Sequence, residues 1–525
     1  MPHQQRNRWT RKLLRGAVVG VGILIILQTT AGIALSQEKE NPTLRLLLNK
    51  GVITQQEYDQ AVEEEKRATA EEKRATAEEK QQMPRGTATT KNGFQVTIGG
   101  FAEIDFVGDN TRSFAEIIGN RPVLRNGTLG GNNSQFQMSP RNSRITLDVE
   151  APERNGIKSR YFAAMDFLGN QPQIGNDGVS EFSNYTSPTP RIFQMFFEVR
   201  SPLADFKVGQ DWSAFGFMSQ YSRAQVSVAA TPANMFNRWI QASVSKHVRV
   251  TNQLSLTPVL SIERPPQRDA SLPSFVAGIQ VAHSGLQAPY AGSSSGDVAL
   301  KPMSFQISGV GRRLEANSGG GTNVSSQTYV TGWGFSSSLF VPVLPSRNGK
   351  MGNTAHVVME GVTGAGIADF FTGLSWGVCN PVCGNSSVNS GFGGAAFGQT
   401  DIDAGLAAVN GQTGQFEAIR ATSMMIHATY YLPDDGKTWI GGGYGTIYSS
   451  NAGQMTCTVS AAFCGGATRT SQSIYLRDST YYAYLFHDFT PEIRAGLETN
   501  WVRTTYADGA NAENRRIQLS LFWRF

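Results

Sequence analysis

The chain has 525 residues, 46 of them basic and 41 acidic, and its formal net charge is +5. This excess lies entirely within the first 36 residues, which contain five basic residues and no acidic one. The remainder is formally neutral, which argues against a nucleic-acid partner, because binding to a phosphate backbone calls for a clustered basic excess.

Residues 1–36 have the organisation of a secretory signal peptide, and we expect cleavage after Ser36. Basic residues come first, an apolar run extends from Gly16 to Leu27, and small residues follow around Ala34. A retained membrane anchor is the alternative, but this run has 12 residues, whereas a spanning helix needs roughly 20. No long apolar run follows, so we expect no transmembrane helix in the mature chain.

Residues 37–92 are predicted to form a periplasmic helical stalk and a linker. A leucine-rich helix ends at Gly51, and Thr54-Gln-Gln-Glu57 forms a capping box for a second helix. The heptad Glu64–Ala70 is then repeated without change at Glu71–Ala77, with alanine as its only apolar residue. A coiled coil and a solvated helix with Glu–Arg pairs three residues apart both remain open.

From residue 93 to residue 525 the sequence predicts an all-β fold, a transmembrane antiparallel β-barrel of about 16 strands. From Ile517 to Phe525 apolar residues alternate with mostly polar ones, so one face would meet lipid and the other water. A strand of a soluble β-sandwich would alternate in the same way. The expected strands are 94–107, 141–151, 157–168, 191–200, 205–213, 238–248, 253–263, 275–283, 303–314, 328–343, 353–369, 416–432, 437–449, 469–489, 492–506 and 515–525.

The connections between these strands are alternately long and short, as in outer-membrane barrels. An even number of strands places both termini on the periplasmic side and the long connections outside. The pattern is least regular between residues 275 and 303, where a Gly- and Ser-rich insertion would lie at a normally short turn. An error of two strands remains open there.

The four cysteines form two close pairs in predicted outer connections. These pairs are Cys379 with Cys383 and Cys457 with Cys464. Export to an oxidising compartment permits local disulfides, and an even count with short spacings fits them. Free thiols or a metal site are the alternatives, but no histidine lies near either pair and the spacings match no zinc pattern. We therefore expect no metal and no cofactor.

A barrel of sixteen strands encloses an aqueous channel, so transport is the expected function. The connection after the fifth strand is predicted to fold inward and narrow the pore, although an ordinary surface loop is the alternative. The candidate constriction residues are Trp212, Phe215, Phe217, Tyr221 and Arg223. Trp212 would pack this connection against the wall.

Lumen charges would set the selectivity of such a pore. The strands of clear parity place seven basic residues inward (Arg144, Lys158, Arg160, Arg200, Arg494, Arg516 and Arg524) and seven acidic ones (Glu103, Asp105, Asp148, Glu150, Asp166, Glu198 and Glu498). Because the counts match, selectivity would depend on where the charges lie. Arg144 and Arg160 on neighbouring strands would form a basic ladder, unless Asp148 or Asp166 pairs with them.

No pattern of catalytic residues emerges. The six histidines are scattered, and neither a Ser/His/Asp order nor a Gly-x-Ser-x-Gly motif occurs. Gly441-Gly-Gly-Tyr-Gly445 lacks the spacing and the lysine of a phosphate-binding loop, so a glycine-rich barrel strand is the better interpretation. We expect the protein not to be an enzyme.

Several segments together resemble the DcaP-like trimeric outer-membrane porins. They are Leu46-Leu-Leu-Asn-Lys-Gly-Val-Ile-Thr54, Gly99-Gly-Phe-Ala-Glu-Ile-Asp105, Ser143-Arg-Ile-Thr-Leu147, Val208-Gly-Gln-Asp-Trp212-Ser-Ala-Phe215, Ala495-Gly-Leu-Glu498 and the closing strand. The resemblance implies a sixteen-stranded homotrimer with a periplasmic helical stalk. It also implies transport of small negatively charged organic solutes such as dicarboxylates.

The sequence therefore predicts a porin of the bacterial outer membrane, surrounded by lipid, through which small hydrophilic, anionic organic solutes such as dicarboxylates diffuse passively. The stalk would contact the cell wall. A barrel of another class is the alternative: a structural or adhesive one whose disulfide-braced outer loops bind a surface partner.

Overall fold

The computed structural model describes residues 86–118, 122–169, 189–216, 232–264, 271–290, 298–318, 326–371, 374–378, 405–410, 415–455 and 472–525, together with Lys50, Thr54, Gln56 and Thr413. The chain divides into two units, Met1–Met83 and Pro84–Phe525. The predicted signal peptide, nearly all of the predicted stalk and the four cysteines with their predicted disulfides lie outside the described residues.

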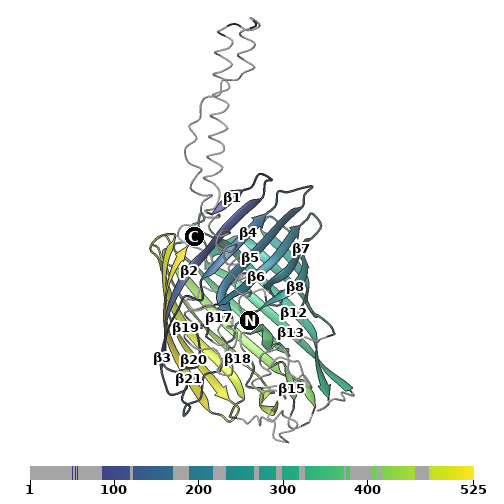
Figure 1. Ribbon diagram of the computed structural model, residues 1–525, viewed down its shortest axis with the longest axis vertical. Helices are drawn as coiled ribbons and strands as arrows, with labels where there is room; N and C mark the ends of the chain where they lie inside the picture. Colours follow the sequence, from purple (N-terminus) through teal and green to yellow (C-terminus); the bar gives the residue numbers. More distant parts are fainter. Residues whose placement is uncertain are drawn as a thin grey trace, which may run out of the picture. The chain divides into compact units, whose positions relative to one another are not determined.

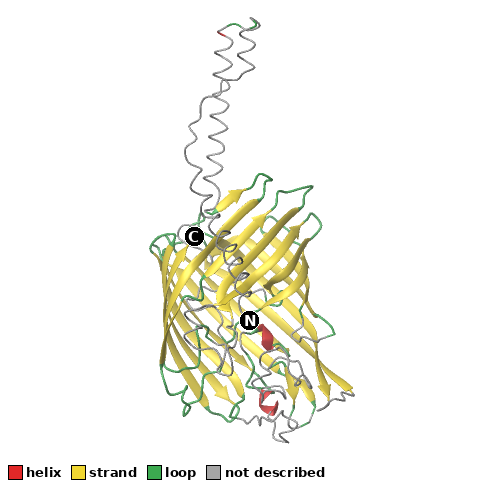
Figure 2. Ribbon diagram, in the orientation of Figure 1, coloured by secondary structure: helices red, strands yellow, loops and turns green. Residues whose placement is uncertain are grey.

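The second unit is built around one antiparallel sheet that closes on itself (Figures 1 and 2). Its last strand pairs with its first long one, so that Leu521 lies opposite Ile104. The strands are β1 (Thr87–Thr89), β2 (Gln95–Asp109), β3 (Gln135–Ser139), β4 (Arg144–Glu150), β5 (Lys158–Gly169), β6 (Thr189–Arg200), β7 (Asp205–Trp212), β8 (Arg238–Ser245), β9 (Val248–Arg249), β10 (Leu254–Glu263), β11 (Ser274–Pro289), β12 (Leu300–Ser318), β13 (Ser326–Leu344), β14 (Thr354–Ala365), β17 (Arg420–Tyr431), β18 (Thr438–Tyr448), β19 (Tyr475–Asp488), β20 (Ile493–Tyr506) and β21 (Asn511–Arg524).

Two of the barrel strands are broken into two parts. β3 and β4 pair with the two halves of β2, and β8 and β9 both pair with β10. Counting each couple once, and leaving aside the short β1, gives a barrel of sixteen strands in the part of the chain that the structure describes. The predicted fold class and strand number are confirmed.

Several predicted strands have different limits in the structure, and two of the differences have a clear cause. The strand predicted at 353–369 ends at Ala365, and a short 3-10 helix, η2 (Ala368–Phe370), follows it. The strand predicted at 275–283 extends to Pro289, because its register shifts between His283 and Gln287 and pairing with β12 then resumes. The bulge takes up Ser284, Gly285 and Leu286 within β11, and residues 291–297 of the Gly- and Ser-rich insertion lie outside the described residues. No strand is added or lost between β10 and β12.

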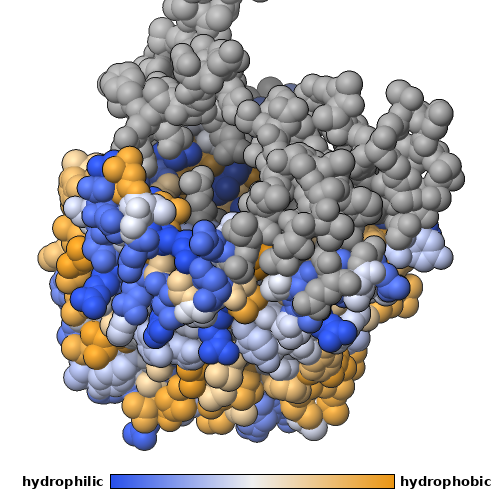
Figure 3. Space-filling view, turned by 90° about the horizontal axis from the view of Figure 1, so that it is seen from below, coloured by the Kyte–Doolittle hydropathy of each residue, from blue (hydrophilic) through white to orange (hydrophobic). Residues whose placement is uncertain are grey.

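The two faces of the sheet have opposite character. Asp105 and Ser520 face inward and are 0% exposed, whereas Leu519 on the outer face is 41% exposed. Figure 3 shows mostly hydrophobic residues along the visible outer edge of the barrel and hydrophilic ones nearer its middle. A polar interior inside an apolar outer surface is the construction of an outer-membrane barrel. Among the residues that the structure describes, no helix is long and apolar enough to cross a membrane.

A hydrophobic core fills part of the barrel interior at the end that carries the long connections. It combines inward-facing wall residues with residues of four connections, those after β2, β7, β14 and β18. The larger side chains from the connections are Phe114, Ile118, Val123, Phe215, Met235, Ile367, Phe370, Trp376, Leu406, Met455 and Ile474, and the wall contributes residues such as Val310, Val362, Ile447 and Val502. Long connections therefore fold into the barrel rather than only covering its mouth.

A short hairpin of β15 (Ala407–Val409) and β16 (Phe416–Ala418) belongs to the connection after β14.

Candidate solute pathway through the barrel

The connection after β7 lies against the inner wall of the barrel. We call its described parts, residues 213–216 and 232–237, the crossing segment. The main-chain N–H of Ala214 donates to Glu263 of β10 at 2.8 Å, and that of Gly216 donates to Ser308 of β12 at 3.0 Å. These contacts lie on strands progressively farther round the barrel.

The returning part of the crossing segment reaches the opposite side. The main-chain N–H of Met235 donates to Glu360 of β14 at 3.4 Å. A Cβ atom built on Gly445 of β18 would lie 2.9 Å from the Cβ of Ala233. In the order of paired strands, β18 is the seventh strand beyond β8, almost half of the sixteen-stranded circumference. The segment therefore crosses the lumen.

Two of the five predicted constriction residues can be placed. The ring of Trp212 contacts Phe193 of β6 and Phe236 of the crossing segment, with centroid distances of 5.8 and 4.8 Å. Phe215 is 2% exposed, and its ring centroid lies 4.8 Å from that of Phe370 in η2. Phe217, Tyr221 and Arg223 lie outside the described residues.

Three arginines gather on the inner wall beside the crossing segment. We call Arg144, Arg191 and Arg238 the arginine cluster. The guanidinium carbons of Arg144 and Arg238 lie 3.5 and 3.7 Å from the ring centroid of Phe193, which is 2% exposed. Arg191 instead donates two hydrogen bonds to Asp166, at 2.9 and 2.6 Å.

Arg144 and Arg238 have no carboxylate within salt-bridge distance in the part of the chain that the structure describes. The Nε of Arg144 and the Nε and Nη1 of Arg238 are buried and make no hydrogen bond there. Glu103 of the neighbouring β2 lies within electrostatic range of Arg144. Asp166 and Asp211 lie within electrostatic range of Arg238, but Asp166 is paired with Arg191 and Asp211 with Lys207. Arg144 and Arg238 therefore keep a positive excess over Glu103.

Most of the other predicted lumen charges lie in local pairs or networks. Arg160 forms a bidentate pair with Asp148, at 2.7 and 2.6 Å, so it does not extend Arg144 into an unpaired basic ladder. Lys158 lies 3.3 Å from Glu153 in the adjoining turn. Asp105 accepts hydrogen bonds from Asn142, Gln518 and Ser520. Positive charge is therefore concentrated at the arginine cluster.

A strict inward–outward alternation along β6 would wrongly place Arg191 and Phe193 on the outer face of the barrel. Alternation counted back from Glu198 places Ile192 inward, yet Ile192 is 48% exposed and Phe193 is 2% exposed. The cause is a bulge, since Gln194 pairs with Ala164 and Ile192 with Met165, leaving Phe193 as the extra residue. Arg238 is the first residue of β8, so no preceding strand residues indicate which face it lies on. The one feature of the sequence that points to it is its position directly after the crossing segment.

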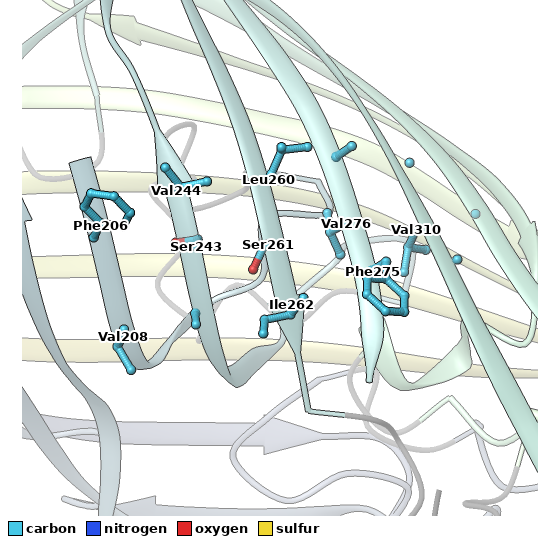
Figure 4. A pocket seen from close by; sticks show the side chains of 15 residues that line it. Phe206, Val208, Ser243, Val244, Leu260, Ser261, Ile262, Phe275, Val276 and Val310 are labelled. Atoms are coloured by element: carbon cyan, nitrogen blue, oxygen red, sulfur yellow. The ribbon is translucent and has the colours of Figure 1, made fainter. Parts of the chain in front are cut away.

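A groove of about 690 Å³ lies elsewhere, among strands β7, β8, β10, β11, β12 and β13 (Figure 4). Its large apolar side chains include Phe206, Leu260 and Phe275, which are 50%, 60% and 54% exposed on the outer face. Because these side chains belong to the surface that meets lipid, the groove is not part of the solute pathway.

Within the described residues, no three His, Cys, Asp or Glu side chains are close enough to hold a metal ion.

The fold is similar to that of known outer-membrane channels. The outer membrane channel DcaP of Acinetobacter baumannii matches with a TM-score of 0.55 at 13% identity, over 83% of this chain and 99% of that one. An anion-selective porin from Comamonas acidovorans matches with a TM-score of 0.40 at 10% identity, over 82% and 100% of the two chains. OmpT of Vibrio cholerae in its trimer form gives 0.43 at 9% identity, over 82% and 99%.

The sequence matches no protein-family model and no curated protein. The likeness to DcaP therefore rests on the fold, and it agrees with the resemblance that the sequence segments carry. The chain is an outer-membrane β-barrel with the fold of the DcaP-like porins.

Proposed function

We propose that the protein is a passive diffusion channel of the bacterial outer membrane that favours small anionic organic solutes. The observation that carries this proposal is the position of Arg144 and Arg238, which stack on Phe193 beside the crossing segment. Neither has a carboxylate within salt-bridge distance among the described residues. DcaP, whose fold this chain shares, is an outer membrane channel.

The arginine cluster has the chemistry to attract carboxylates. A guanidinium group that stacks on an aromatic ring uses its face, so the N–H groups at its edge remain available for hydrogen bonds. Carboxylates accept two such bonds from one guanidinium. Fixed charges also act more strongly in a narrow channel with low-dielectric walls than in bulk water. Because a solute with two carboxylates could engage both Arg144 and Arg238, dicarboxylates are the proposed solutes.

The local excess matters more than the total charge of the lumen. Arg160 and Lys207 on the same side of the barrel lie next to carboxylates, those of Asp148 and Asp211, at 2.6 and 2.7 Å. Such pairs present little net field to a passing ion. The arginine cluster would therefore set the ion preference at the level of the crossing segment.

We further propose that residues 1–36 are removed on export and that the mature protein is a homotrimer. Residues 37–92 would form a helical stalk that contacts the cell wall. The paired cysteines would form local disulfides, Cys379 with Cys383 and Cys457 with Cys464. These proposals rest on the sequence patterns and the family resemblance described above.

Swelling of proteoliposomes tests whether the protein is a channel at all. Vesicles containing the mature protein should swell in an isotonic solution of a neutral pentose, and protein-free vesicles should not. Swelling no faster than in protein-free vesicles, with the barrel shown to be folded by its heat-modifiable migration in a gel, would leave an adhesive or structural barrel instead.

A further inference from the structure

We infer that the narrow part of the pore is built by two interlocked connections, and that an ion pair between Arg312 and Asp369 holds the second one in place. The second connection is represented by residues 366–371, which follow β14 and include η2. We call this stretch the bracing segment. The inference rests on the proposed channel function, because it assigns a role in setting pore size.

The crossing and bracing segments are joined by main-chain contacts. The N–H of Phe236 donates to the carbonyl of Phe370 at 3.0 Å, and Met235 forms an isolated β-bridge with Phe371. The side-chain amide of Asn237 donates to the carbonyl of Asp369. Main-chain bonds of this kind fix both the register and the separation of two segments.

Apolar packing joins the same two segments. The rings of Phe215 and Phe370 meet edge to face at a centroid distance of 4.8 Å, and they are 2% and 1% exposed. Met235, at 3% exposed, belongs to the same core as both rings. The inner end of the crossing segment is therefore held by the bracing segment as well as by the wall.

Arg312 of β12 attaches the bracing segment to the wall. Its Nη1 lies 2.6 and 2.7 Å from the two carboxylate oxygens of Asp369, and the two side chains are only 2% and 6% exposed. The same nitrogen donates to the carbonyl of Gly366 at 3.3 Å, and the guanidinium carbon lies 4.4 Å from the ring centroid of Phe370. One wall arginine thus contacts three residues of the bracing segment.

A buried ion pair of this kind fixes the position of the bracing segment and adds no net charge to the pore. Arg312 and Asp369 neutralise each other, so the pair adds little to the field that selects ions. In some proteins buried polar groups fix the register of the segments they join, and we assign the same role to this pair. Arg312 and Asp369 are therefore positioning residues, and their loss should alter the size of the pore and leave its ion preference unchanged.

The test compares unitary conductance and solute size limit among variants of the full mature chain. The double variant Arg312→Met, Asp369→Leu removes the pair without changing net charge. Phe370→Ala removes the ring that packs on Phe215 and leaves the pair intact. Both should raise the unitary conductance about twofold, because a wider neck passes more ions. Both should also admit larger neutral polyethylene glycols, with an unchanged reversal potential.

The matched control is Arg125→Met, Asp508→Leu, which removes an ion pair between two other connections. It should leave conductance and size limit at the wild-type values. If the double variant does not fold, as judged by heat-modifiable migration, Phe370→Ala decides the question. Wild-type conductance and size limit in every folded variant would overturn the inference and leave the proposed channel intact. A folded wild-type protein that carries no current would instead contradict the channel, and the inference with it.

Discussion

Arg516 of β21 and Asp109 of β2 form an ion pair across the seam where the barrel closes. The Nε–Oδ1 and Nη2–Oδ2 distances are 2.9 and 2.7 Å, and both side chains are 0% exposed. Arg516 also donates to the carbonyls of Ala115 and Glu116. One arginine therefore joins the last strand, the first long strand and the connection after it.

Breaking this seam pair should destabilise the barrel strongly. Asp109→Asn leaves the Arg516 guanidinium buried without its carboxylate, which costs about 3–5 kcal/mol in comparable sites. Urea-dependent unfolding of the protein in lipid vesicles, followed by tryptophan fluorescence, measures the loss. Asp508→Asn, at an exposed pair, is the control and should unfold at nearly the wild-type urea concentration. Equal midpoints for the two variants would show that the seam pair contributes nothing.

The arginine cluster makes a prediction about ion preference. Arg144→Gln and Arg238→Gln should each lower the anion-to-cation permeability ratio, by about twofold, because each removes a positive charge from a cluster with a positive excess. The double variant Arg160→Gln, Asp148→Asn is the control, since it removes a neutral pair from the same wall. Reversal potentials under a salt gradient give the ratios. A control that shifts as much as the two single variants would refute a special role for the cluster.

The glycines of β18 predict a steric effect on stability. A Cβ atom at Gly443 would lie 2.5 Å from the carbonyl oxygen of Ile426 and 2.6 Å from the hydroxyl of Tyr482. Gly443→Ala should therefore destabilise the barrel by about 1–3 kcal/mol, as overpacking does elsewhere. Gly311→Ala is the matched control, because a Cβ there meets nothing within 4 Å. Equal unfolding midpoints for the two alanine variants would contradict this reading of the glycine-rich strand.

One pair of outer connections should open at low pH. Arg125 donates two hydrogen bonds to Asp508, at 3.1 and 2.6 Å, and these hold the pKa of Asp508 below its usual value. A carboxyl group whose pKa is depressed on folding stabilises the folded form above its unfolded pKa, and this contribution is lost as pH falls through the depressed value. Hydrogen exchange at residues 122–126 should therefore be faster, relative to the intrinsic rate, at pH 2 than at pH 7. Asp508→Asn should remove the difference.

Much of the barrel could be predicted from sequence because its signals are local and repeated. Alternation along β21 separates lipid-facing Leu519 from lumen-facing Ser520, and the structure gives exposures of 41% and 0%. The even number of strands follows from the alternating lengths of the connections. The Gly441–Gly445 motif was also interpretable, since inward glycines leave room for Tyr482 and Tyr484.

The rest depends on contacts that no local pattern reports. The bulge at Phe193 reverses the parity of Arg191, so the arginine cluster could not be assembled by counting residues. The bracing segment looks like an ordinary outer connection in the sequence, because its partners, Arg312 and Phe215, are remote along the chain. Long-range packing decides whether a connection folds inward, whereas alternation reports only the strands.

The reversal potential of the reconstituted mature protein tests the central claim most directly. In a planar bilayer with asymmetric potassium chloride, the protein should open steady channels whose reversal potential has the sign of an anion preference. A folded barrel that carries no current, or one whose reversal potential shows a cation preference, would contradict the account.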